Sequence, residues 1–221
     1  MPTAVSYHSF ILNDDHLRHA IAVTLTMWSD PQYRQFLRSK SPGTLGDQWF
    51  GWFVRSWSVS RTIKKGKQEP VRQHLDTVLR SELAAGKGAD AIDDAARFIR
   101  DQGWSARRSL AGRASLPVSL VSKVGFLFRP HEITPSDNLA RKGLDKLRRE
   151  MGQGQLRDRS YREYLAAFDA EFDRSQDQIR EALVESRATE MGAKSGCLKR
   201  VCASVAVQRK VLDSYLMEIG R

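Results

Sequence analysis

Cysteine is scarce in this sequence, and the two that occur, Cys197 and Cys202, lie close together in one predicted helix. Two thiols cannot complete a four-thiolate zinc or iron–sulfur site, and the five histidines are scattered along the chain. We therefore expect no metal and no other cofactor. No apolar run approaches the roughly 18 residues of a membrane span, so no membrane association is expected. The first residues lack a basic segment followed by an apolar one, which predicts no export signal and a cytoplasmic protein.

Alternation of apolar and polar residues, the mark of a strand, is also missing, as are internal repeats and low-complexity segments. Apolar residues recur instead at three- and four-residue spacing, which is typical of amphipathic helices. Besides the stretch described below, helices are expected at residues 14–29, 32–39, 44–57, 69–86, 88–103, 158–191 and 198–219, with Asp14 or Asp15 capping the first and Thr44 the third. The pattern predicts a single all-α domain over residues 1–221. Its helical core is residues 1–152, a C-terminal helical part (153–221) packs on it, and the protein is expected to be a monomer.

Acidic residues are outnumbered. The chain has 36 Lys and Arg against 26 Asp and Glu, a formal charge of +10. Such an excess favours a polyanionic partner, most often nucleic acid, although a soluble protein can also be basic without one. The long helix expected at residues 158–191 is acidic, so the positive charge is concentrated in residues 55–149.

One stretch, residues 116–146 within 115–149, brings chemically useful groups together. It opens with Leu116-Pro117, runs into an apolar helix that carries Lys123, leaves that helix at Arg129-Pro130, and reaches Asp137 at the start of a basic helix expected at residues 138–149. The prolines mark these boundaries, because proline disfavours helix at the residue before it and suits the first helical turn. A lysine and an aspartate are thus delivered to one short connection.

This stretch resembles the core of the helix-hairpin-helix DNA glycosylases, especially their 8-oxoguanine branch. Leu116-Pro117 matches the start of the family's hairpin, Lys123 falls where the branch keeps its nucleophile, and Pro135-Ser136-Asp137 matches the Pro-x-Asp that holds the catalytic aspartate. The hairpin glycines are absent, since Val118, Ser119 and Leu120 stand in that region. The segment between Lys123 and Asp137 is shorter than the family's by about one helical turn.

The resemblance implies a DNA glycosylase, which flips a modified base out of double-stranded DNA and cleaves its N-glycosidic bond. Asp137 and Lys123 would be the catalytic residues. The missing glycines suggest a diverged member aimed at an unusual base, such as a phage modification met in anti-phage defence. The candidate DNA-binding residues are Arg107, Arg108, Arg113, Ser119, Ser122, Arg129, Arg141, Lys142 and Lys146.

Each assignment has a structural alternative. An aspartate after Pro-Ser is commonly a helix N-cap, as Ser136 could also be, and a lone lysine on an apolar helix often reaches out to solvent. The basic helix could be only a solvated face. The aromatic residues of the third helix could form core or a base-stacking platform, namely Trp49, Phe50, Trp52, Phe53 and Trp57. A non-catalytic helical DNA-binding or toxin–antitoxin-type protein is therefore the alternative function, and an RNA-binding module is a third.

Overall fold

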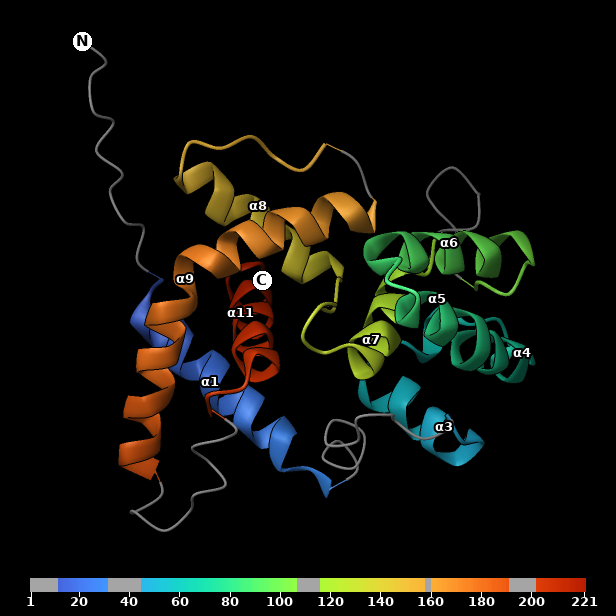
Figure 1. Ribbon diagram of the computed structural model, residues 1–221, viewed down its shortest axis with the longest axis horizontal. Coiled ribbons are helices and arrows are strands. Elements are labelled where there is room, and N and C mark those ends of the chain that lie inside the picture. Colours follow the sequence, from blue (N-terminus) through green and yellow to red (C-terminus); the bar gives the residue numbers. More distant parts are fainter. Residues whose placement is uncertain (1–11, 32–44, 107–115, 158–159, 191–201) are drawn as a thin grey trace.

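The computed structural model describes residues 12–31, 45–106, 116–157, 160–190 and 202–221 (Figure 1). Over these residues the chain is helical, and its one β-type pairing is an isolated bridge between Ile63 and Ser105. The all-α prediction is confirmed. The helices are α1 (Asp14–Ser29), α3 (Asp47–Ser56), η1 (Ser60–Thr62), α4 (Gln68–His74), the π-helical turn η2 (Leu75–Leu79), α5 (Arg80–Ala84), α6 (Gly88–Asp101), α7 (Val118–Phe128), α8 (Asn138–Glu150), α9 (Tyr161–Glu190) and α11 (Val205–Ile219).

Two helix starts differ from prediction. The N-cap of α1 is Asn13, whose side chain accepts hydrogen bonds from the amides of Asp15 and His16, so neither Asp14 nor Asp15 caps the helix. Asparagine ranks with aspartate as an N-cap, and Asn13, which directly precedes the first helical residue, occupies the capping position. The helix expected at 198–219 is interrupted at the extended Ser204, after which α11 begins at Val205, and its expected start at 198 lies outside the described residues. The expected helix at residues 32–39, the cap at Thr44 and Cys197 lie outside the described residues.

Two groups of helices build the molecule (Figure 1). Helices α1, α8, α9 and α11 pack together, with α11 against both α1 and α8, while α3, α4, α5, α6 and α7 lie on the other side. Contacts of α6 with α9 join the groups, and their buried apolar side chains belong to one continuous cluster. None of the described helices has both the length and the apolar character to cross a membrane.

Helices α8 and α11 cross with their backbones in direct contact. A Cβ atom added to Gly143 would lie 2.0 Å from the carbonyl oxygen of Leu216, and one added to Gly220 would lie 2.1 Å from that of Leu139. Any side chain at either position would therefore force the helices apart. This crossing places the first turn of α8, which directly follows Asp137, beside the C-terminal end of α11.

Candidate active site

A pocket of about 810 Å³ opens where the two helix groups meet. It is lined by residues of α1, the end of α3, α7, the segment before α8, and α11. Both candidate catalytic residues, Lys123 and Asp137, are on its wall. Its volume lies within the usual range for small-molecule sites, roughly 300–1,000 Å³.

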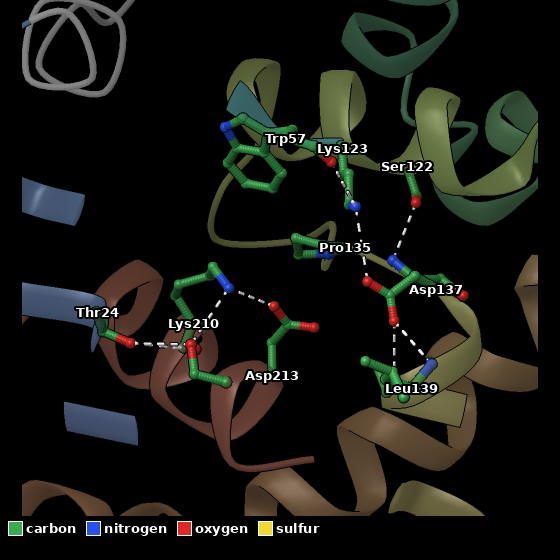
Figure 2. A network of polar contacts seen from close by, with 12 residues as sticks. Thr24, Trp57, Ser122, Lys123, Pro135, Asp137, Leu139, Lys210 and Asp213 are labelled. Carbon is green, nitrogen blue, oxygen red and sulfur yellow. Dashed lines mark hydrogen bonds and ion pairs between the residues drawn. The ribbon is translucent and has the colours of Figure 1, made fainter. Parts of the chain in front are cut away.

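Asp137 is the N-cap of α8. Its Oδ1 accepts hydrogen bonds from the backbone amides of Leu139 (2.9 Å) and Ala140 (3.0 Å), which satisfies two of the first amides of the helix. Its other oxygen, Oδ2, faces Lys123 (Figure 2). One oxygen of this carboxylate is thus occupied by the cap, and the other is directed at the lysine.

The extended segment that carries Asp137 is held along its length. The backbone amide of Ser136 donates to the hydroxyl of Ser122 (3.0 Å), and the buried hydroxyl of Tyr164 donates to the carbonyl of Pro135 (3.1 Å). The hydroxyl of Tyr161 donates to the carbonyl of Thr134 (2.7 Å). Because α7 and α9 both hold this segment, the position of Asp137 relative to Lys123 is set by the surrounding fold.

Lys123 reaches from α7 to two acceptors. Its Nζ lies 3.6 Å from Oδ2 of Asp137 and donates a hydrogen bond to the carbonyl oxygen of Trp57 (3.2 Å). That carbonyl belongs to the turn that ends α3, where the amide of Ser58 donates to Arg55 and that of Val59 donates to Val54. Ser58 is left-handed (φ 55°), as this type of helix ending requires. The turn thereby presents the Trp57 carbonyl to the lysine.

Lys123 is largely withdrawn from water, with 8% of the residue exposed. Burial lowers the pKa of its ammonium group, since a charged amine loses solvation in the protein. The carboxylates of Asp137 and Asp213 oppose this shift, and the charge of Lys210 adds to it. A lowered pKa increases the fraction of neutral amine, the form that can act as a nucleophile.

A second lysine–aspartate pair stands on the opposite wall of the pocket (Figure 2). Lys210 Nζ lies 2.5 Å from Oδ2 of Asp213 and donates to the hydroxyl of Ser214 (3.3 Å). The hydroxyl of Thr24 in α1 lies 3.1 Å from that of Ser214. Burial raises the pKa of the Asp213 carboxyl, and the charge of Lys210 opposes the rise.

Sequence reasoning did not find this second pair. Lys210 and Asp213 are three residues apart, so they share a helix face, but Val207, Val211 and Leu212 fall within about 140° of the circumference, as in an ordinary amphipathic helix. The sequence therefore gave no signal that this charged pair is buried.

The aromatic residues of α3 divide between the two predicted roles. Phe50 and Phe53 are fully buried in the core, and Trp49 packs against it. Trp52 and Trp57 line the pocket. The centroid of the Trp57 ring lies 5.7 Å from Nζ of Lys123 and 5.8 Å from Nζ of Lys210. At these distances the ring makes a cation–π contact with each lysine.

Those candidate DNA-binding residues that the structure describes do not converge on one spot. Ser119 lines the pocket, whereas the hydroxyl of Ser122 is buried and accepts from the Ser136 amide. Arg129 donates to the carbonyls of Leu83 (3.3 Å) and Ala84 (3.5 Å) at the end of α5.

On the basic helix the candidates differ in exposure. Arg141 donates to the carbonyl of Ser160 (2.6 Å) and lies over the ring of Tyr164. Lys142 and Lys146 are exposed on α8, although neither lines the pocket. Arg107, Arg108 and Arg113 lie outside the described residues. Lys142 and Lys146 are thus the candidates with exposed side chains to offer a phosphate.

Among the described residues, no group of three or more His, Cys, Asp and Glu side chains is arranged to hold a metal ion. Comparisons with protein-family models, with curated proteins and with solved structures find no match to this chain. The resemblance to the helix-hairpin-helix DNA glycosylases therefore stays a prediction that rests on the residues quoted for it.

Proposed function

We propose that the protein is a DNA glycosylase that excises a modified base from double-stranded DNA. One observation carries the proposal: Lys123 and Asp137, from two different helices, lie 3.6 Å apart on the wall of a pocket that is also lined by two tryptophans. A flipped base needs an enclosed space with aromatic surface, and cleavage of its bond to the sugar needs a carboxylate beside it.

Asp137 would stabilise the transition state. Cleavage of the N-glycosidic bond leaves positive, oxocarbenium-like charge on the deoxyribose, and a nearby carboxylate lowers the energy of that charge. The capping bonds to Oδ1 fix the carboxylate without using Oδ2. A preorganised group of this kind does not have to reorient as the charge develops.

Lys123 has two possible roles in this reaction. As a nucleophile, its neutral amine would attack the sugar C1′, the base would leave with the bonding electrons, and the resulting Schiff base would permit strand cleavage. As a supporting group, its ammonium would hold Asp137 in place while water attacks C1′ and loses a proton. The hydrogen bond to the Trp57 carbonyl and the shortened spacing to Asp137 favour the supporting role.

The duplex would be held through its phosphates. Exposed basic side chains are present on α8, in η1 and on the loop that follows η1, namely Lys142, Lys146, Arg61, Lys64, Lys65 and Lys67. Their ammonium and guanidinium groups can neutralise phosphates without reading sequence. Arg55 and the loop are close in sequence to Trp57, which lines the pocket. A side chain from this region could fill the gap that a flipped base leaves in the duplex.

A panel of duplexes tests the proposal. Each duplex would carry one modified base, including oxidised, alkylated and enlarged phage-type bases, and alkali would convert abasic sites into strand breaks. We expect cleavage of at least one duplex by the parent protein. Failure of every duplex, together with tight DNA binding, would contradict the glycosylase assignment.

A non-catalytic DNA-binding protein is the second candidate, and a specific observation favours it. Asp137 caps α8, and Lys123 bonds the end of α3, so each residue already has a structural partner. In that case the exposed lysines would bind duplex DNA and no base would be released. The same duplex panel separates the two functions.

A further inference from the structure

Asp213 lines the pocket and has a buried carboxylate oxygen that no contact within the described fold satisfies. It is 1% exposed, and its Oδ2 is paired with Lys210, yet its Oδ1 has no hydrogen-bond partner among the described residues. An unpartnered oxygen of a buried carboxylate is costly, by roughly 1–3 kcal/mol or more. Such an atom is therefore expected to have a partner that arrives from outside the chain.

Lys210 supplies the complementary atom. An ammonium group has three N–H bonds. Two of them are directed to Oδ2 of Asp213 and to the hydroxyl of Ser214. Since Lys210 and Asp213 both line the pocket, a ligand that enters it meets an acceptor and a donor side by side.

The charges of the pocket indicate a neutral ligand. The two lysine–aspartate pairs sum to zero formal charge (Figure 2), and the other charged residues of the lining, Asp30, Glu218 and Arg221, add one negative charge. A phosphate would meet two carboxylates as well as two ammonium groups, so the pocket offers no net attraction for it. A neutral planar ligand can instead place its face against the apolar and aromatic part of the lining, which includes Trp52.

We infer that Asp213 and Lys210 read the hydrogen-bonding edge of a nucleobase: Oδ1 of Asp213 accepts from an exocyclic amine, and Lys210 Nζ donates to the adjacent ring nitrogen or carbonyl. This inference rests on the proposed function, because it places the base on one wall and its glycosidic bond near Asp137 on the other. It selects amine-bearing bases of the cytosine and adenine type, with or without a further substituent.

A double substitution tests the inference without leaving a buried charge unpaired. Asp213→Asn alone would leave Lys210 without its carboxylate and could fail to fold. Lys210→Met combined with Asp213→Val removes both charges, and replacing a buried ion pair by apolar residues is often neutral or stabilising. Glu171→Gln is the matched control, because Glu171 is also a buried carboxylate paired with a basic residue three positions away, Arg174, and does not line the pocket.

The first measurement is excision from the duplex panel. We expect the double variant to melt at or above the parent temperature, to bind duplex DNA as the parent does, and to lose excision by about a hundredfold or more, because a site that relies on hydrogen bonds to its ligand discriminates strongly. Glu171→Gln should excise at the parent rate. A stable double variant with the parent's rate and base preference overturns the inference, and the pair would then be structural.

The second measurement needs no catalysis. Deoxycytidine and the pyrimidin-2-one deoxyriboside differ in the exocyclic amine, as do deoxyadenosine and the purine deoxyriboside. Titrations followed by the indole NMR signal of Trp57 should show about tenfold tighter binding of the amine-bearing member of at least one pair by the parent, and no such difference in the double variant.

Together, the two measurements distinguish failure of the proposed glycosylase function from failure of the proposed base recognition by Lys210 and Asp213. If the parent excises nothing but prefers the amine-bearing nucleosides, the proposed function fails and the recognition pair stands. If the parent binds neither member of either pair, or binds both equally, the recognition pair is wrong whether or not excision occurs.

Discussion

The two lysine–aspartate pairs that face each other across the pocket are built differently. Lys123 and Asp137 come from α7 and from the start of α8, their charged atoms are 3.6 Å apart, and 10% and 19% of their side chains are exposed. Lys210 and Asp213 lie three residues apart on one helix at 2.5 Å, and Asp213 is almost completely buried.

The difference indicates what each pair can do. The short contact within α11 holds the Lys210 side chain in place, which suits a fixed hydrogen-bond donor. The longer contact between α7 and α8 shares Lys123 between a carboxylate and a carbonyl, and burial favours its neutral form. Chemistry is therefore expected at the first pair and recognition at the second. Four predictions test this division, in order of decreasing effect.

Breaking the pair within α11 should have the largest effect, and the effect should be on stability. Asp213→Ala leaves a buried ammonium without its counter-charge, and we expect the free energy of unfolding to fall by about 3–5 kcal/mol. Urea denaturation measures the change. Glu218→Ala on the same helix removes a more exposed carboxylate and should cost about 1 kcal/mol or less. Equal losses in the two variants would mean that Asp213 is not a buried, strongly coupled charge.

Changing the aspartate of the other pair should affect activity instead. Asp137→Asn keeps the cap, because asparagine ranks with aspartate at that position, so the free energy of unfolding should change by about 1 kcal/mol or less. Base excision should fall by a factor on the order of a hundred or more, since the transition state loses its carboxylate. Thermal melting and the duplex assay on this single variant provide both numbers. Full activity in Asp137→Asn would remove Asp137 from the reaction.

The pH dependence of covalent trapping examines Lys123. Burial lowers the pKa of this amine. If its neutral form is the nucleophile, the rate of borohydride trapping should rise about tenfold per pH unit below that pKa and level off above it. Lys123→Ala should form no adduct. If the parent shows no trapping at any pH while Lys123→Ala still releases the base, the attacking group is water and the lysine only supports Asp137.

The smallest effect is expected away from both pairs. Lys142→Ala and Lys146→Ala remove exposed charges of α8, and each should lower the slope of log affinity against log salt by about 1 if it contacts a phosphate. Binding titrations at several salt concentrations measure the slope, and excision at saturating DNA should not change. An unchanged slope in both variants would mean that this face of α8 does not contact DNA.

The helical character of the chain and the position of Asp137 could be predicted from sequence because both depend on local signals. Proline at 130 and 135 limits where the chain can be helical, and a carboxylate directly before a helix accepts bonds from its first amides wherever the helix packs. The π-helical turn at Leu75–Leu79 gave no such signal, since a single extra residue in a helical turn barely alters the apolar pattern.

The two lysine–aspartate pairs of the candidate site differ in how much of their arrangement the sequence reveals. The sequence by itself determined only that Lys123 and Asp137 flank one helix-to-helix connection, whereas the contacts of α7 and α9 with residues 134–136 bring the two charged groups to 3.6 Å. Only the tertiary structure decided that Lys210 and Asp213 face them. That arrangement depends on the close crossing of α8 and α11 at Gly143 and Gly220, and a glycine in the sequence does not reveal which backbone will approach it.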